Sequence, residues 1–276
     1  MVSPSPPPTL PTWARLPINR CNLPAAILGS LAYQRHPVPL KLDGVEDLHH
    51  RLFARLHDMS TPGERARAFM THMAAEFSLE HPEEAGFSPN WPYRRARANY
   101  LKVLRGWAFD ADGREAAVLK GWVESRFGLL PRHHGGPIRD FSGPTYRHYL
   151  EQRSGGLYNT NGLEAQLDLL YAYCQHELAR QFAGVSHLTL YRGINRMGDY
   201  EVIEAGERGR RILLLNSLNS FTDVRERACE FGDTILEARI PLTKILVFQS
   251  LLPGKLKGEA EYAVIGGVHE VGCAVL

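Results

Sequence analysis

The stretch LTLYRG at residues 188–193 indicates where the sheet of this chain begins, and two other short motifs follow it. These motifs are NSFTD at residues 219–223 and GEAEYAVIGG at residues 258–267. A run of apolar residues that ends in a cation and a glycine is typical of a buried strand that delivers a side chain to a cleft. We therefore expect Arg192 to enter such a cleft, with Gly193 allowing a ligand to approach the backbone closely.

Arg192 carries the group best suited to a diphosphate in this first motif. A guanidinium presents a rigid fork of N–H donors that matches phosphate oxygens. The alternative is an ordinary strand end with a solvated arginine, and this motif alone does not decide between the two.

Small hydrogen-bonding residues crowd the second motif, where a strand is expected to enter a turn. Asp223 has the position of an N-cap for a helix over residues 224–231, with Glu226 three residues later as its capping-box partner. A capping box explains Asp223 fully. It does not explain Ser220.

Two glutamates, Glu259 and Glu261, characterise the third motif. In an extended segment their side chains point to the same side, because side chains alternate with period two. Two like charges at such a short distance repel each other, so the arrangement is unfavourable unless it serves a function. A solvated edge neutralised by Lys255 and Lys257 is the alternative. The apolar residues 262–265 follow directly, so Glu261 is expected to begin a core strand.

Together the three motifs resemble the Arg-Ser-Glu class of mono-ADP-ribosyltransferases. Two segments are similar in sequence to the dinitrogenase reductase ADP-ribosyltransferase family: residues 191–201 (YRGINRMGDYE) and residues 219–241 (NSFTDVRERACEFGDTILEARIP). The chain departs from the wider class at Phe221, which stands in the middle of its usual Ser-Thr-Ser, and at Thr222, which replaces the last serine. The leading hydroxyl of Ser220 is retained.

This resemblance implies NAD as the substrate and gives the three polar residues their roles. When nicotinamide leaves, positive charge develops on the ribose, and a carboxylate beneath that charge stabilises it. Glu261 is expected to supply this carboxylate, and Ser220 to orient it. The arginine that accepts ADP-ribose is protonated at physiological pH, so a second carboxylate must hold it and remove a proton. That role falls to Glu259.

The resemblance also implies a set of NAD contacts and a set of partners. The expected NAD-binding residues are Arg192, Gly193, Ser220, Thr222 and Phe231. The expected protein substrate is dinitrogenase reductase, which would be inactivated reversibly at an arginine in response to nitrogen or energy status. A PII-type nitrogen signalling protein is the expected regulator, and the loop over residues 250–258 lies where similar enzymes contact their target.

Three other functions stay open at this point. The chain could be an NAD glycohydrolase, in which water replaces the acceptor, or an ADP-ribosyltransferase for another target. From a different class, it could be a non-catalytic interaction protein whose N-terminal helices bind a partner. The histidines of the N-terminal half lack Cys or Asp companions at ligand spacing, so no metal site is expected.

The composition excludes several classes of function. The chain has 276 residues, 44% of them hydrophobic and 22% charged, with a formal net charge of +2 and no long basic run, which argues against a nucleic-acid partner. No secretory leader and no apolar segment of about 18 residues are present, so membrane insertion is not expected. A cytoplasmic location fits the scattered cysteines, which are Cys21, Cys174, Cys229 and Cys273.

Hydrophobic periodicity predicts an α+β fold with a helical N-terminal half and a mainly antiparallel, strand-rich core at the C-terminal end. We expect a proline-rich lead and wrapping segment at residues 1–40, a helical part at 41–150 and an NAD-binding core at 151–276, forming one compact body. Helices are predicted over 25–33, in two segments between 44 and 77, and over 93–109, 116–127, 146–152 and 163–182. Strands are predicted after residue 187 and over 234–242, 244–249, 261–267 and 269–275, the last two joined by a turn at 266–267. The loop 131–143 contains His133 and His134, which could contact a ligand or lie in a mobile connection.

Overall fold

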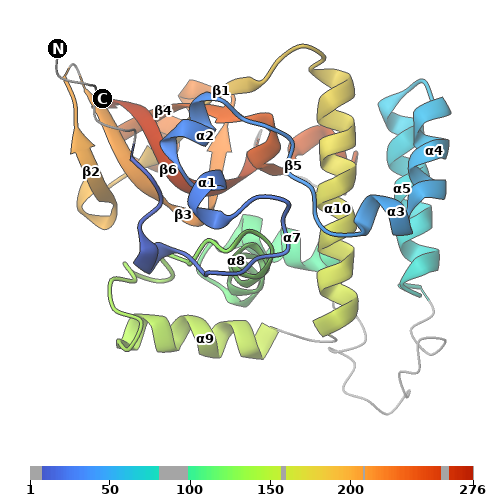
Figure 1. Cartoon of the computed structure of the whole chain (residues 1–276), viewed down its shortest axis with the longest axis horizontal. Helices are drawn as coiled ribbons and strands as arrows, with labels where there is room; N and C mark the ends of the chain where they lie inside the picture. Colours follow the sequence, from blue (N-terminus) through green and yellow to red (C-terminus); the bar gives the residue numbers. More distant parts are fainter. Residues whose placement is uncertain (1–7, 81–98, 157–159, 208, 256–260, 276) are drawn as a thin grey trace.

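The computed structural model describes residues 8–80, 99–156, 160–207, 209–255 and 261–275. Helices dominate the first two thirds of the chain, and a six-stranded sheet forms the remainder (Figure 1). The α+β class is therefore confirmed. The helical elements before the sheet are η1 (Thr12–Ala14), α1 (Ala25–Leu28), α2 (Leu31–Arg35), α3 (Val45–Leu48), α4 (His50–Asp58), α5 (Pro62–Glu76), α7 (Tyr100–Phe109), α8 (Arg114–Phe127), α9 (Pro144–Gly156) and α10 (Thr160–Gln181).

Local sequence signals account for several helix ends. Helix α5 begins with a capping box in which Thr61 and Glu64 bond each other's backbone N–H, and Pro62 occupies the first turn. Helix α8 ends at Gly128, whose φ of 70° lies in the left-handed region. The helix end predicted at residue 127 is confirmed. The second segment predicted between residues 44 and 77 is α5, whereas the first is divided into α3 and α4.

Two helix predictions need correction. The single helix expected over 25–33 is divided into α1 and α2, because the Ser30 side chain accepts a hydrogen bond from the Tyr33 N–H and begins a new helix. Helix α9 (Pro144–Gly156) continues four residues beyond the end predicted at residue 152. A Cβ at Gly156 would lie 3.0 Å from the Arg114 carbonyl oxygen, so this glycine allows α9 to pack closely on α8. The helix predicted over 93–109 is described only from Tyr100 onward.

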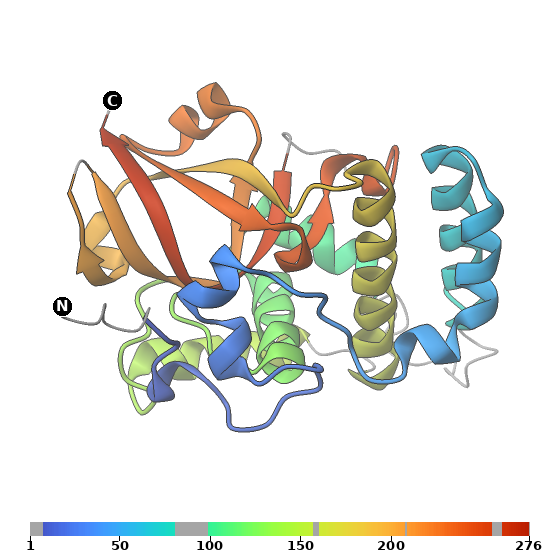
Figure 2. The same cartoon turned by 45° about the horizontal axis from the view of Figure 1, so that its top comes forward.

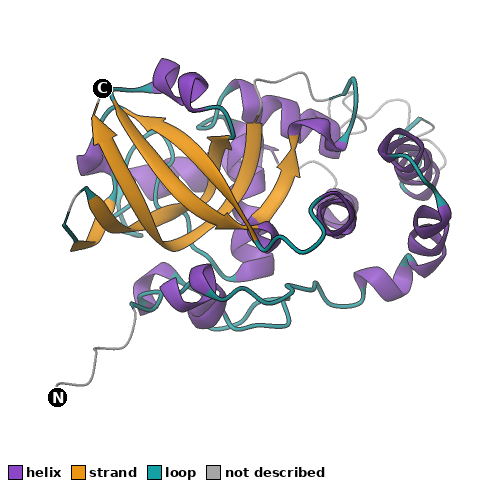
Figure 3. Cartoon of the chain, turned by 90° about the horizontal axis from the view of Figure 1, so that it is seen from above, coloured by secondary structure: helices purple, strands orange, loops and turns teal. Residues whose placement is uncertain are grey.

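The sheet is antiparallel in every described pairing and has the strand order β2-β3-β1-β4-β6-β5, with β3 also paired to β6. The long strands β3 and β6 extend across it (Figure 3). The bounds of the strands are β1 His187–Ile194, β2 Glu201–Ala205, β3 Arg210–Thr222, β4 Thr234–Pro241, β5 Ile245–Phe248 and β6 Glu261–Val275. Strand β2 is largely exposed and was not among the strands expected from the sequence.

Strand β6 is continuous, so the turn expected at residues 266–267 is wrong. A Cβ on Gly266 would lie 1.7 Å from the Asn216 carbonyl oxygen of β3, and a Cβ on Gly267 would lie 2.9 Å from the backbone of Gly29. The Val268 N–H donates to the Gly29 carbonyl oxygen at 2.8 Å. The two glycines therefore admit neighbouring backbone and do not reverse the chain.

One apolar core includes side chains from the N-terminal lead, the helices and the sheet, from Leu10 through Tyr171 to Val271. Helix α10 stands between the sheet and the hairpin of α4 and α5 (Figures 1 and 2). A buried ion pair between Arg65 and Glu177 joins this hairpin to α10. Within the described ranges, no helix is both long and apolar enough to cross a membrane.

Candidate active site

The three sequence motifs meet where β1, β3 and β6 lie next to one another. Tyr191 of β1 pairs with Thr222 of β3, and Thr222 pairs in turn with Glu261 at the start of β6. The antiparallel register therefore brings Arg192, Ser220 and Glu261 to one end of the sheet. Residues that are 28 and 41 positions apart in the chain become neighbours.

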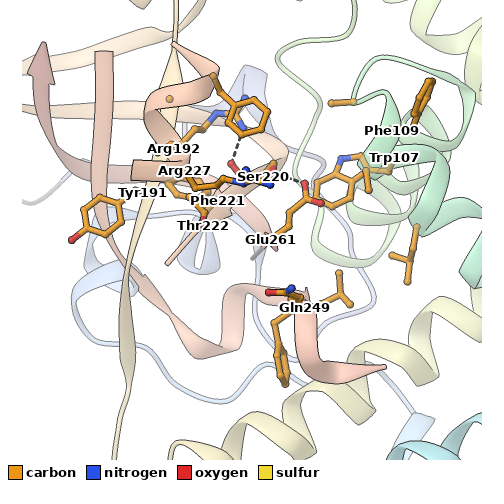
Figure 4. A pocket seen from close by; sticks show the side chains of 18 of the residues that line it. Trp107, Phe109, Tyr191, Arg192, Ser220, Phe221, Thr222, Arg227, Gln249 and Glu261 are labelled. Atoms are coloured by element: carbon orange, nitrogen blue, oxygen red, sulfur yellow. Dashed lines mark hydrogen bonds between the residues drawn. The ribbon is translucent and has the colours of Figure 1, made fainter. Parts of the chain in front are cut away.

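A direct hydrogen bond joins the serine and the glutamate. The Ser220 hydroxyl donates to Oε1 of Glu261, and both side chains are partly buried. Because the serine is held in strand β3, its hydroxyl fixes the orientation of the carboxylate (Figure 4). The resemblance implied a contact between these two side chains, and the role of Ser220 in orienting Glu261 stays a prediction.

The guanidinium of Arg192 connects β1 to Ser220 of β3 and to Tyr200, the residue before β2. Its Nη1 donates to the Ser220 carbonyl oxygen at 2.7 Å, and its Nε donates to the Tyr200 hydroxyl at 3.0 Å. A guanidinium has more N–H donors than these two bonds use, so Arg192 can bind an anion while it stays fixed to the protein.

Gly193 has a structural reason to be glycine that differs from the one expected. A Cβ at this position would lie 2.0 Å from the Ala228 carbonyl oxygen in α11 (Arg225–Ala228). The close neighbour of this backbone is therefore the following helix, which must approach β1 to complete the site. Gly193 nevertheless lines the cavity at the site.

The expectation that Asp223 caps the next helix is wrong. Helix α11 begins one residue later than predicted, with Val224 at its N-cap and no side-chain capping bond. The Val224 N–H donates to the Thr222 hydroxyl at 3.1 Å, a local bond in the turn before α11 that is not a helix cap. Asp223 instead accepts a hydrogen bond from the Tyr262 hydroxyl at 3.2 Å.

Two adjacent cavities open at this end of the sheet. The first has a volume of about 750 Å³ and contains Glu261 and Thr222 in its lining, and the second has a volume of about 480 Å³. Both are lined by Trp107, Ala111, Arg192, Gly193, Ser220 and Phe231. The two cavities are therefore halves of one cleft, with the arginine and the serine at their common boundary. Phe231, in the turn η4 (Cys229–Phe231), is half exposed there.

Comparison with known proteins shows the family of the chain. The model of the dinitrogenase reductase ADP-ribosyltransferase family matches residues 18–273. The chain belongs to this family. A relative from Rhodospirillum rubrum, named NAD(+)–dinitrogen-reductase ADP-D-ribosyltransferase, is 39% identical over 262 residues, which cover 94% of this chain and 95% of the relative. No solved structure matches the chain.

In this member of the dinitrogenase reductase ADP-ribosyltransferase family, the helical half contributes cleft residues that were not expected from the sequence. Trp107 of α7 lines both cavities, although the sequence predicted only its place in a helix over 93–109, whose apolar positions are expected to pack in the core. Its buried ring satisfies that assignment too. A pattern of apolar spacing cannot distinguish a core position from a cavity wall, because both are covered by protein.

The second cavity is also formed by the loop after α8. Arg132 and His133 line it, so one of the two histidines considered as ligand contacts does lie at the cleft, whereas His134 is fully buried beneath it. The Arg132 side chain is 7% exposed, and Nη2 forms an ion pair with Glu201. Among the described residues, its Nε and Nη1 have no hydrogen-bond partner, and the guanidinium lies over the Trp13 ring, 4.5 Å from the ring centroid.

A buried lysine, Lys120, and the carboxylate of Asp112 hold this loop in place. Lys120 is buried and its Nζ donates to Asp112 at 3.1 Å and to the His133 carbonyl oxygen at 2.9 Å. Burial lowers the pKa of Lys120. Burial alone would raise the pKa of Asp112, but the hydrogen bond from His133 and the charge of Lys120 together hold it below its usual range. Asp112 therefore stays ionised and anchors the loop.

Glu259, the other predicted catalytic residue, lies outside the described residues. Among the residues that the structure does describe, no cluster of three or more His, Cys, Asp and Glu side chains could hold a metal ion.

Proposed function

We propose that this protein transfers ADP-ribose from NAD to an arginine side chain of dinitrogenase reductase. The observation that carries the proposal is the hydrogen bond from Ser220 to Glu261 in a cavity beside Arg192. The family membership of the chain and the printed name of its Rhodospirillum relative support the same reaction.

The carboxylate of Glu261 is the group that acts on NAD. Loss of nicotinamide leaves positive charge on the ribose, and a fixed carboxylate in a partly desolvated cavity stabilises that charge more than water does. The Ser220 hydroxyl holds the carboxylate in one orientation before the reaction begins, so little reorganisation is needed in the transition state. Thr222 and Phe231 line the same cavity, and we assign them, with Gly193, to the nicotinamide ribose part of NAD.

The rest of NAD extends into the second cavity. Arg192 lies at the boundary of the two cavities, where a diphosphate joined to a ribose at Glu261 would pass. Beyond it the lining includes three cations, Arg132, Arg139 and Arg196. We assign the ADP part of NAD to this side of the cleft because these donors suit phosphate oxygens.

Glu259 remains the proposed partner of the acceptor arginine. It stands two residues before Glu261 in the sequence, and a carboxylate is required there because a protonated guanidinium is a poor nucleophile. A PII-type signalling protein stays the proposed regulator on the strength of the family resemblance. A reducing cytoplasm suits the four cysteines, all of which are free thiols.

The test is incubation of the purified protein with labelled NAD and purified dinitrogenase reductase, beside the Glu259→Gln variant. We expect label on an arginine of the target with the wild type only, and release of nicotinamide by both proteins. Nicotinamide release by the wild type without labelling would replace transfer with NAD glycohydrolysis. Absence of both signals would leave a non-catalytic interaction protein. Equal loss of hydrolysis and transfer in Glu259→Gln would contradict the separate roles of the two glutamates.

A further inference from the structure

Phe109, the last residue of α7, is 94% exposed although it lines the cavity that contains Glu261. Single exposed apolar residues are common and need no explanation. This one is different because a second aromatic side chain of the same cavity, Phe231, is 56% exposed. Two phenyl rings in water, both at the opening of one cavity, form a site at which burial by a partner would be favourable.

The neighbours of Phe109 on α7 form one wall of this opening. Arg105 and Ala108 are exposed and line the same cavity. The Arg105 Nε donates to the Lys255 carbonyl oxygen at 3.1 Å, which attaches the end of α7 to the turn that precedes the third motif. We call Arg105, Ala108, Phe109 and Phe231 the aromatic rim.

The chemistry of the reaction requires a protein acceptor to touch this opening. For transfer, the acceptor nitrogen must approach the ribose carbon to about 3–3.5 Å, and that carbon is held at Glu261. An arginine side chain enters the cavity from a backbone that must stay outside. The residues on either side of the acceptor arginine therefore lie against the rim.

Building on the proposed transfer to a protein arginine, we propose that the aromatic rim is the docking surface for the protein acceptor, with Phe109 as its main anchor. The complementary segment of the acceptor carries an apolar side chain next to the modified arginine, which covers the Phe109 ring. It also carries an acidic group, which faces the exposed guanidinium of Arg105. Aromatic residues at the centre of an interface contribute a large share of its binding free energy, which is why the claim centres on Phe109.

The experiment compares full-length wild type, Phe109→Ala and Phe109→Tyr. Three quantities are measured: the Kd for NAD, the rate of NAD hydrolysis without acceptor, and kcat and KM for transfer to dinitrogenase reductase. Phe109→Ala is expected to lower kcat/KM for the acceptor about tenfold or more through a higher KM, as for an interface anchor. Both NAD quantities should stay at the wild-type values. Phe109→Tyr keeps the ring and should retain most of the wild-type kcat/KM.

Leu48→Ala is the matched control, because Leu48 is 75% exposed on α3 and lines neither cavity. It should behave as wild type in all three measurements. Unchanged transfer by Phe109→Ala, or an equal fall in its NAD hydrolysis, would overturn the docking surface. A wild-type dimer in gel filtration that Phe109→Ala abolishes would assign the rim to a second copy and overturn it as well. Failure of the wild type itself to label the acceptor would instead contradict the proposed function, and the docking surface with it.

Discussion

Among the single residues of the site, Ser220 has a central place because of its hydroxyl. Ser220 donates to the Glu261 carboxylate through its side chain and accepts from Arg192 through its backbone carbonyl, so it joins the two charged groups of the site. Phe221 and Thr222, at which the chain departs from the wider class, have other tasks. Phe221 is buried in the core, and the Thr222 hydroxyl supports the start of α11.

Ser220→Ala should therefore impair the reaction more than it impairs folding. Loss of one hydrogen bond between partly buried groups costs about 1 kcal/mol of stability. A carboxylate that is no longer held is misplaced, and misplacement of a catalytic group lowers the rate about tenfold to 100-fold. We expect kcat for NAD hydrolysis to fall by this factor with little change in KM, and Ser220→Thr to restore part of it. A wild-type kcat in Ser220→Ala would show that the hydroxyl has no positioning role.

Several of these residues could be identified from the sequence because their chemistry is unusual for their position. A serine that no cap explains and a glutamate directly before an apolar strand both pointed to the site, and the structure joins them by a hydrogen bond. The role of Asp223 could not be identified, because its hydrogen-bond partner Tyr262 lies on β6 and only the folded sheet brings the two residues together. Trp107 and Arg132 were missed as cleft residues because they come from the helical half, and only tertiary packing brings them there.

At the scale of elements, the packing of α11 and η4 on β1 forms the site. The backbones approach so closely that a Cβ on Gly193 would overlap the Ala228 carbonyl oxygen, and a Cβ on Gly232 would lie 2.3 Å from the backbone of Ile194. This contact fixes η4, which carries Phe231 to the cavity. The positions of the elements along the chain were largely predictable from periodicity. Their contacts were not, as the continuous strand β6 shows, because a glycine pair predicts either a turn or a close backbone contact.

Gly193→Ala should separate these elements and destabilise the protein. The added methyl group meets backbone atoms, which cannot move aside as a flexible side chain can, so a cost of about 2 kcal/mol or more is expected. In calorimetry the melting temperature should fall by at least about 4 °C, and NAD binding should weaken. Gly198→Ala is the control, because a Cβ there has no heavy atom within 4 Å. Equal melting temperatures for the two variants would contradict this packing argument.

At the scale of the whole molecule, the N-terminal lead, α10 and the sheet meet at the turn η5 (Leu242–Lys244). The Thr243 hydroxyl bonds the Tyr33 hydroxyl at 2.7 Å, and the Thr243 carbonyl oxygen accepts from Tyr171 at 2.7 Å. Lys244 is buried beside them, and its Nζ donates to the Gly266 carbonyl oxygen. We propose from these contacts that the N-terminal lead, α10 and the sheet fold as one unit, which a single cooperative transition in urea would support and two separate transitions would exclude.

The stability of this junction should depend on pH through Lys244. Burial lowers the pKa of Lys244 to about 7, whereas the unfolded chain keeps the ordinary value near 10.5. Between these two pKa values the unfolded state binds more protons than the folded state, so the free energy of unfolding rises with pH. Below pH 7 Lys244 is charged in both states, and the folded state then carries the full cost of burying that charge. From pH 7 to 9 wild type should gain about 2 kcal/mol relative to Lys244→Met in urea unfolding. A difference that is constant over this range would contradict the assignment.

The most direct test of the account measures NAD hydrolysis by the Glu261→Gln variant at saturating NAD, together with its Kd for NAD. Glutamine keeps the shape of the side chain and can still accept a hydrogen bond from Ser220, but it removes the negative charge. We expect a rate about 100-fold or more below that of wild type, with a nearly unchanged Kd. A rate close to that of wild type, or a loss explained entirely by weaker NAD binding, would contradict the claim that Glu261 stabilises the charge developing on the ribose.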